Sequence, residues 1–171
     1  GCMWYGIGNT VIANPSTMSV VLRRDGRVVL YNGAVDIGQG TYTVLPQICA
    51  EALGLPLALF EQVCADTDLT ADAGKSSASR QTFVSGNAAR LAGLALRARL
   101  LALAGVTDGP AVSITVEACT LVVRDGARLL RVDLGSLPAD QGGAVARGTG
   151  HFDPPTVPLD ADGQGVPYAT Y

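Results

Sequence analysis

The hydrophobic positions along the chain change their spacing several times, and each change marks an expected element. Residues 19–22 and 27–31 are largely β-branched or apolar, and they flank Asp25-Gly26. An Asp-Gly pair between two such runs is a strong signal for a β-hairpin. Further strand-like runs are expected at residues 60–65, 112–116, 121–123, 129–134 and 143–148. This distribution predicts a largely antiparallel sheet.

Two stretches between the β segments have the periodicity of helices. The first ends at Gly54 and Pro56, which together are a stop signal. The second continues to about residue 103. The order β-hairpin, α, β, α and β predicts an α+β fold, with two helices packed on one face of a mostly antiparallel sheet. The positions expected to share one face are Leu45, Ile48, Cys49, Ala52 and Leu53 in the first helix, and Val84, Ala88, Leu91, Ala95 and Ala98 in the second.

Length and composition fit one domain. We expect a single domain over residues 1–171, with an irregular tail, rich in Pro and Gly, over residues 150–171. A hydrophobic content of 48% with 16% charged residues indicates an ample core and extra apolar surface for neighbours. The net charge of −3 argues against a nucleic-acid binder. No apolar run approaches the ~18 residues of a membrane span. Because there is no initiator Met, we interpret the chain as part of a longer polypeptide.

The cysteines do not form a metal-binding pattern. They are widely spaced among apolar neighbours, no CxxC occurs, and His151 is the only histidine. We therefore expect no zinc or iron–sulfur site held by this chain alone. Reduced, buried thiols favour a cytoplasmic location. The four cysteines are Cys2, Cys49, Cys64 and Cys119.

Two other kinds of site are rejected. The acidic loop from Asp66 resembles a calcium loop, but its sixth position is Ala71 and its twelfth is Ser77, where Gly and Glu are required. No serine or cysteine has an obvious base beside it. The chain by itself is therefore not expected to be catalytic.

Two polar segments directly precede the two helices. One is Gly38-Gln39-Gly40, and the other is the hydroxyl-rich run at residues 75–81, which contains Arg80. The first turn of a helix has free N–H groups and a partial positive charge, so it suits an anion. Because each helix follows a strand, adjacent junctions would place both N-termini at one edge of the sheet, where a single ligand could bridge them. The alternative is that both segments only cap their helices, with Thr41 as the first N-cap.

Longer motifs in this order are more specific than either segment alone. They are VDIGQGTYTVLPQICAEALGLP, ADTDLTADAGKSSASRQTFVSGNAA and GTGHFDPPTVPLD, preceded by CMWYGIGNT and NPST. Together they resemble the xanthine dehydrogenase/aldehyde oxidase family of molybdenum hydroxylases. The resemblance covers almost the whole chain and is to the second molybdopterin-binding domain of the large molybdenum subunit.

The resemblance implies a role for particular residues. Residues 38–40, the glycine turn, would contact the pterin or pyrophosphate of the cofactor. The hydroxyl-rich run at residues 75–81, the serine segment, would wrap the pterin and phosphates with N–H groups and hydroxyls. In bacterial members this molybdenum cofactor is usually molybdopterin cytosine dinucleotide. The implied cofactor-binding residues are Gly38, Gln39, Gly40, Ser76, Ser77, Ala78, Ser79, Arg80 and Gln81.

The resemblance also implies an activity that this chain does not complete. The family hydroxylates an aldehyde or N-heterocycle with oxygen from water, uses a glutamate base, and passes electrons to [2Fe–2S] clusters. The GVGE-type segment that supplies the glutamate and the cluster cysteines are absent from this sequence. We therefore expect a cofactor-positioning domain, inactive alone. Its expected partners are the remaining domains of the molybdenum subunit, and iron–sulfur and FAD subunits or domains.

Two alternatives remain open at this stage. A scaffold or subunit-interaction module that has lost the cofactor would have its own side chains in the space between the two polar segments. An unrelated binder of a phosphate ligand would contain nucleotide without molybdenum.

Overall fold

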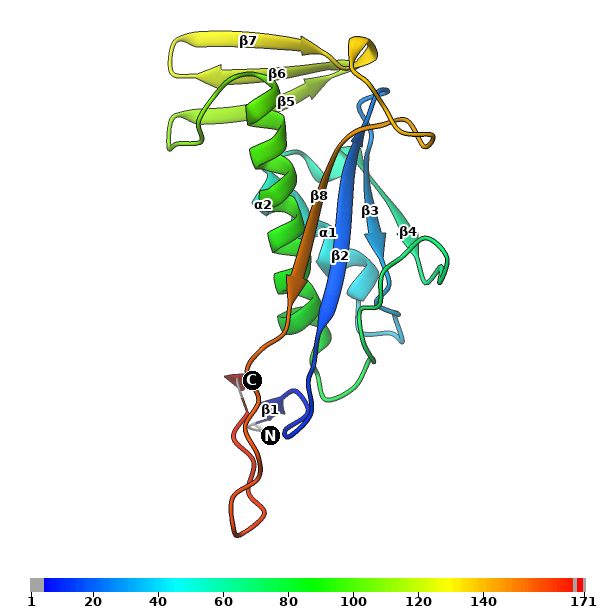
Figure 1. Ribbon diagram of the computed structural model, residues 1–171, viewed down its shortest axis with the longest axis vertical. Helices are drawn as coiled ribbons and strands as arrows, with labels where there is room; N and C mark the ends of the chain where they lie inside the picture. The colour runs from blue at the N-terminus through cyan, green and yellow to red at the C-terminus, as the bar shows by residue number, and fades with distance from the viewer. Residues whose placement is uncertain (1–4, 168, 171) are drawn as a thin grey trace.

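The computed structural model describes residues 5–167 and 169–170 of the chain. A four-stranded sheet with the order β4-β3-β2-β8 forms its centre (Figure 1). β2 pairs antiparallel with β3 and with β8, while β3 and β4 are parallel. These strands are β2 (Ser16–Arg23), β3 (Val28–Asn32), β4 (Phe60–Cys64) and β8 (Ala144–Phe152).

Two helices pack against this sheet, α1 (Thr41–Leu53) and α2 (Gly86–Leu103). α2 lies against β8 and β2, and α1 lies against α2. The close approach of α2 to β8 requires Gly148 and Gly150, because an added Cβ at Gly150 would overlap the Ala88 carbonyl oxygen. The helices and the sheet enclose an apolar core that includes Met18, Leu22, Leu30, Leu45, Leu53, Leu96 and Leu100.

α1 tolerates a proline because a side chain takes over the hydrogen bond that the proline removes. Pro46 lies inside the helix and has no N–H for the carbonyl of Tyr42. The side chain of Gln62, on β4, donates from Nε2 to that carbonyl at 2.7 Å. α1 ends at Leu53, and Gly54 caps it with a φ of 81°, the left-handed conformation typical of helix ends.

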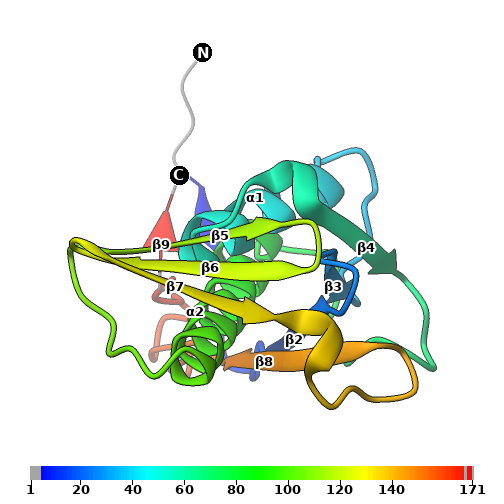
Figure 2. The same ribbon diagram turned by 90° about the horizontal axis from the view of Figure 1, so that it is seen from above.

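A separate antiparallel sheet, β5-β6-β7, lies across one end of α2 (Figure 2). Ile114, Leu121 and Val123 bury its inner face in the common core. Its strands are β5 (Val112–Glu117), β6 (Thr120–Asp125) and β7 (Arg128–Asp133). The remaining elements are the paired strands β1 (Gly6–Ile7) and β9 (Ala169–Thr170), the 3₁₀ turns Leu57–Leu59 and Leu134–Ser136, and the π-helical turn Gln81–Ser85.

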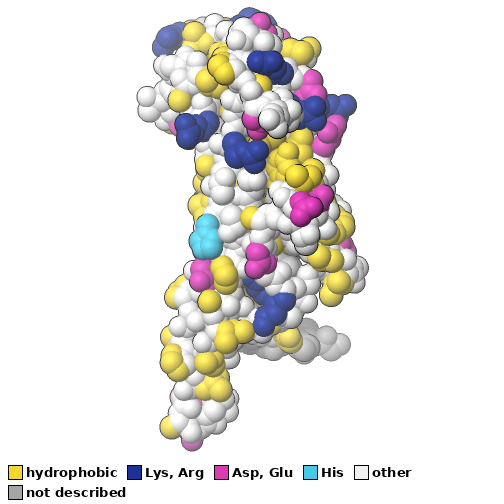
Figure 3. All heavy atoms as spheres, turned by 45° about the vertical axis from the view of Figure 1, so that its right-hand side comes forward, with side chains coloured by type: hydrophobic (Ala, Val, Ile, Leu, Met, Phe, Trp, Pro, Cys, Tyr) yellow, Lys and Arg dark blue, Asp and Glu magenta, His cyan; other side chains and the backbone are white. Residues whose placement is uncertain are grey.

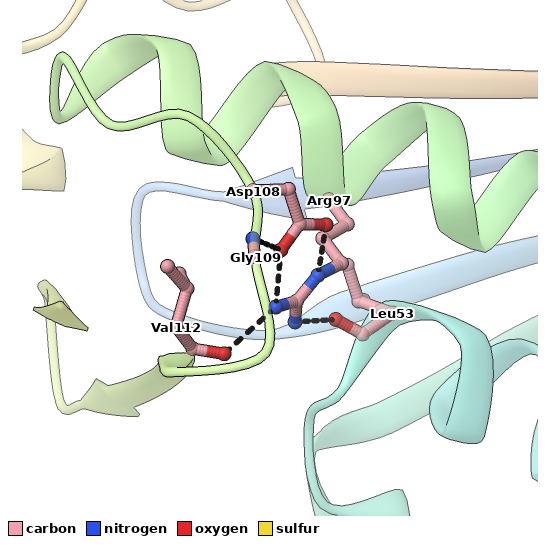
Figure 4. Close-up of polar contacts among 5 residues, drawn as sticks. All are labelled: Leu53, Arg97, Asp108, Gly109 and Val112. Carbon is pink, nitrogen blue, oxygen red and sulfur yellow. Dashed lines mark hydrogen bonds and ion pairs between the residues drawn. The ribbon is translucent and has the colours of Figure 1, made fainter. Parts of the chain in front are cut away.

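Arg97 fastens this second sheet to the helices (Figure 4). Its Nε and Nη2 donate to the Asp108 carboxylate at 2.7 and 2.9 Å. Nη1 donates to the Leu53 carbonyl at 3.2 Å and Nη2 to the Val112 carbonyl at 3.0 Å. The hydrogen bond from Arg97 lowers the pKa of Asp108. One guanidinium thus joins the end of α1, α2 and the start of β5.

The α+β class and its two helices agree with the sequence prediction, and so does the hairpin at Asp25-Gly26. Three details differ. The strands form separate sheets, and the central one contains a parallel pair. The last long strand extends to Phe152, beyond the expected residue 148 and into the expected tail. The buried face of α2 is Ala88, Ala89, Ala92, Gly93, Leu96, Leu100 and Leu101, whereas Ala98 is exposed.

The segment after β8 extends away from the sheet as an arm (Figure 1). Val157, Leu159 and Val166 on it are 45, 46 and 67% exposed. Hydrophobic side chains are visible on this projecting part of the surface (Figure 3). Among the described residues, no helix is long and apolar enough to cross a membrane. Cys2 and the start of the CMWYGIGNT motif lie outside the described residues.

Candidate functional site

The two polar segments meet at one edge of the central sheet. Residues 33–40 connect β3 to α1, and residues 65–80 connect β4 to the turn before α2. Because β3 and β4 are parallel neighbours, their carboxyl ends lie side by side, which is where open sheets commonly bind ligands. A cavity of about 430 Å³ opens between the segments. It is lined by Tyr5, Ile37, Gln39 and residues 76–82.

The turn before α1 is held by Asp36, which sequence reasoning did not single out. Its Oδ1 accepts from the Gly38 N–H at 2.7 Å, and its Oδ2 accepts from the Tyr42 N–H at 3.2 Å. These backbone hydrogen bonds, from Gly38 and then Tyr42, lower the pKa of the Asp36 carboxyl. The N-cap of α1 is Gly40, with φ 81°, so the alternative of Thr41 as N-cap is wrong. An aspartate just before a helix start was the available signal.

Asp36 changes what the α1 side of the cavity offers. Its carboxylate already accepts from the Tyr42 amide in the first turn of α1 and from the Gly38 amide just before it, so a second anion there would meet a negative charge. Gln39 folds onto its own turn, since Oε1 accepts from the Ile37 N–H at 2.6 Å and Nε2 donates to the Val35 carbonyl at 3.1 Å. A Cβ built at Gly38 or Gly40 would meet nothing within 4 Å. A ligand can therefore approach this backbone closely.

The serine segment has an uncommon backbone conformation. Ala78 and Ser79 both have φ of 50°, which non-glycine residues rarely adopt. Such residues concentrate at binding sites, where the surrounding structure holds them in place. Here the Ala78 carbonyl accepts from the Gly8 N–H at 2.9 Å. Ser77 and Ser79 are exposed, so their hydroxyls are accessible to a ligand.

Arg80 fixes this segment from behind. Its side chain is only 1% exposed. Nη1 donates to the carbonyls of Ala73 and Lys75 at 2.8 and 3.0 Å, and Nη2 to those of Asn14 and Pro15 at 2.8 and 2.7 Å. From the sequence, this charge was expected to lie beside the serine hydroxyls and to help bind an anion. The structure instead directs it to four carbonyls, because residues 14–15 and 73–75 converge on the guanidinium.

A π-helical turn, Gln81–Ser85, directly precedes α2. Such turns are rare in proteins, and those that occur often lie at functional sites. Gln81 is 5% exposed, and its amide reaches Ser76 on the cavity and Ser85 in the core. Gln81 thus belongs to the interior more than to the surface of the site.

The described part of the chain supplies no metal centre of its own. No group of three or more His, Cys, Asp or Glu residues is placed to hold a metal ion there. Cys49, Cys64 and Cys119 are free thiols. Burial raises the pKa of Cys49 to about 12, so this thiol stays protonated.

Known proteins resemble this sequence. A model of the molybdopterin cofactor-binding domain matches residues 1–171. A nicotinate dehydrogenase subunit of Pseudomonas putida is 31% identical over 130 residues, covering 75% of this chain and 11% of that protein. The xanthine dehydrogenase molybdenum-binding subunit of Escherichia coli O157:H7 is 36% identical over 88 residues, covering 51% of this chain and 12% of that protein. The chain therefore spans only a small part of these relatives.

A solved structure shares the fold. The aldehyde oxidoreductase of Desulfovibrio desulfuricans superposes with a TM-score of 0.65 and 27% identity, covering 97% of this chain and 16% of that one. The family model spans the whole chain, and the likeness in structure covers nearly all of it. We conclude that the chain belongs to the molybdopterin cofactor-binding domains of the molybdenum hydroxylase family.

Proposed function

We propose that this chain binds the molybdenum cofactor in the cavity between the two strand-to-helix junctions. The observation that carries the proposal is that one cavity of about 430 Å³ touches both polar segments. This volume lies in the range of small-molecule sites. It would take part of a pterin nucleotide, and the remaining domains of the molybdenum subunit would enclose the rest.

The residues around the cavity suit such a ligand. Gly38 and Gly40 leave backbone open to a flat group, and Ile37, which is 73% exposed, offers apolar contact beside them. On the other side, the hydroxyls of Ser77 and Ser79 can donate to phosphate oxygens. Asp36 disfavours a phosphate at α1, so the serine side is the better place for negative charge.

The nine residues expected from sequence then have two kinds of role. Gly38, Gln39, Gly40, Ser76, Ser77, Ala78 and Ser79 would contact the cofactor. Arg80 and Gln81 would act mainly by holding the serine segment, since both side chains are buried and bonded inward. The family resemblance further supports the cytosine dinucleotide form of the cofactor.

The activity proposed for the whole protein is water-derived hydroxylation of an aldehyde or N-heterocycle. The bound cofactor would supply the redox chemistry, and this chain would bind and orient it. The glutamate base and the [2Fe–2S] clusters would lie elsewhere, with an FAD domain or subunit as a further partner. The relatives named as subunits of dehydrogenases support such an assembly. The free thiols support a cytoplasmic location.

Ser79→Asp tests the proposed site. Ser79 is exposed, and aspartate tolerates its positive φ, so the fold should be retained while the new carboxylate repels phosphate. We expect the cofactor to bind the full-length protein about tenfold more weakly, which corresponds to about 1.4 kcal/mol, so that the purified protein contains less molybdenum and less acid-released nucleotide than wild type. The matched variant Ser79→Asn has the same shape as aspartate without the charge, keeps an N–H donor in place of the hydroxyl, and should load more cofactor than Ser79→Asp.

Equal loading of the two variants would contradict this placement of the cofactor. Absence of both molybdenum and nucleotide from active wild-type protein would favour the scaffold alternative. Nucleotide without molybdenum would favour an unrelated phosphate-ligand binder. The open cavity argues against the scaffold, whose own side chains would fill that space.

A further inference from the structure

A hydrogen-bonded series of side chains runs from the core to the cavity and ends on the opposite rim. Ser16 Oγ on β2 lies 2.9 Å from Ser85 Oγ, and Ser85 donates to Oε1 of Gln81. Nε2 of Gln81 donates to Ser76 Oγ at 3.2 Å, and Ser76 donates to the Val35 carbonyl at 2.8 Å. Ser16 and Ser85 are fully buried.

The donor and acceptor in every one of these bonds can be assigned. A serine hydroxyl has one proton. The Ser85 proton goes to Gln81, so Ser16 must be the donor to Ser85. The Ser76 proton goes to Val35, so Ser76 must accept from Gln81. If the Gln81 amide were reversed, its oxygen would face Ser76 and compete with Val35 for that proton.

This assignment determines what Ser76 can offer a ligand. Its only proton is committed to Val35, so toward the cavity Ser76 has an acceptor and no donor. It would therefore face an N–H or O–H of the ligand, whereas Ser77 and Ser79 can face phosphate oxygens. Because Val35 belongs to the segment before α1, the Ser76 bond also ties the two sides of the cavity together.

We propose that Gln81 is a positioning residue that, through Ser76, links the two sides of the cavity and keeps Ser76 an acceptor toward the cofactor. The proposal rests on the proposed function for its cofactor, but the link between the two sides does not. A satisfied buried polar network rigidifies its surroundings, which is the effect expected of Gln81. Its position in the π-helical turn, between core and cavity, suits this role.

Gln81→Glu, made in the full-length protein, is the most direct test. Glutamate has the same shape. In its ionised form, reached at alkaline pH because burial disfavours the charge, it still accepts from Ser85, but its second oxygen accepts where the amide donated. It therefore draws the Ser76 proton away from Val35. We expect hydrogen exchange at residues 35–40 of the cofactor-free protein to become about tenfold faster. We also expect the cofactor to dissociate about tenfold faster, which corresponds to the loss of one hydrogen bond.

Gln62→Glu is the matched control. Gln62 also donates its amide to a carbonyl, that of Tyr42, but it does not line the cavity. This variant reports the general effect of losing a structural glutamine donor and adding a charge. Cofactor dissociation in Gln81→Glu should be faster than in Gln62→Glu even where the two proteins have the same melting temperature, which a merely structural role would not produce.

Ser76→Ala is the second variant, for use if Gln81→Glu does not fold. Ser76 is half-buried, and its loss should reproduce the faster exchange at residues 35–40. The proposal would be overturned if exchange at residues 35–40 stayed at the wild-type rate in Gln81→Glu or, if that protein does not fold, in Ser76→Ala. It would also be overturned if the cofactor dissociated from that variant no faster than from Gln62→Glu. If wild-type protein holds no cofactor, the proposed function fails, while faster exchange still supports the Gln81 link. If wild type and Gln81→Glu hold cofactor equally, the link to the cofactor fails and the proposed function stands.

Discussion

Two charged side chains, Asp36 and Arg80, set the backbone on the two sides of the cavity. Asp36 accepts hydrogen bonds at the start of α1, and Arg80 donates to carbonyls behind the serine segment. Both satisfy backbone groups of the chain itself. This explains how loops with several residues at positive φ keep one conformation without regular secondary structure.

Replacing Asp36 with asparagine should remove part of the acid dependence of the α1 junction. The folded-state pKa of Asp36 is lowered from 3.8, so its contribution is present above pH 3.8 and is lost as the pH falls through the lowered value. The protection of the first turn of α1 against hydrogen exchange, taken relative to the intrinsic exchange rate at each pH, should fall in wild type over that acidic range. In Asp36→Asn this protection should be lower already at neutral pH and change less on acidification. The exposed Asp68 offers a control, Asp68→Asn, and an Asp36→Asn profile like that of the control would contradict this role.

Arg80→Met should destabilise the 171-residue chain. Each buried carbonyl that loses its partner costs about 1–3 kcal/mol, and at least two of the four accepting carbonyls are buried. We expect a loss of about 2–4 kcal/mol in urea unfolding. Arg80→Lys should lose less, because it keeps the charge and some of the donors. The exposed Arg90 supplies the control, and Arg90→Met should change stability by less than about 0.5 kcal/mol. Similar unfolding of the two methionine variants would show that Arg80 is not a clamp.

At the scale of elements, α2 and β8 are in close backbone contact. The strand presents Gly148 and Gly150 to a helix face of Ala88 and Ala92, so the two backbones approach closely. This packing fixes the axis of α2 and hence the place of the π-helical turn before it, whose Gln81 and Thr82 line the cavity. The contact between α2 and β8 therefore helps to position the serine segment, which precedes α2 in the chain.

Gly150→Ala tests this packing. The new Cβ would overlap the Ala88 carbonyl oxygen and the Ala92 nitrogen, so helix or strand must shift. Overpacking of this kind costs about 1–3 kcal/mol, which thermal unfolding of the 171-residue chain would detect. Gly109→Ala is the matched control, since a Cβ there meets nothing within 4 Å. A Gly150→Ala chain as stable as this control would mean that the close approach is not needed.

Local signals predicted some elements and missed others for identifiable reasons. The Asp25-Gly26 pair by itself favours a tight turn, so the hairpin was predictable. The extent of β8 was not predictable, because glycine is a poor strand former. Gly148 and Gly150 are needed there only because α2 packs closely against them. The face of α2 was misjudged because small and apolar residues occur all round this helix, which leaves its period ambiguous.

At the scale of the whole molecule, the order of strands and helices brings the two polar segments together. Parallel pairing of β3 and β4 sets both helix starts at one edge, as the alternation of elements in the sequence predicted. The direction of the Arg80 side chain was not predictable, since its acceptors Asn14 and Pro15 lie about 65 residues away in sequence. Sequence thus indicated where the candidate site lies, and tertiary contacts determine which side chains face it.

The central claim is that the glycine turn and the serine segment bind the same cofactor molecule. Hydrogen exchange tests this claim directly. The full-length protein would be compared with and without bound molybdenum cofactor. We predict that amides in residues 35–41 and in residues 76–82 both become protected on loading, while those in β5, β6 and β7 do not change. Protection of only one of the two segments, or of neither, would contradict the account.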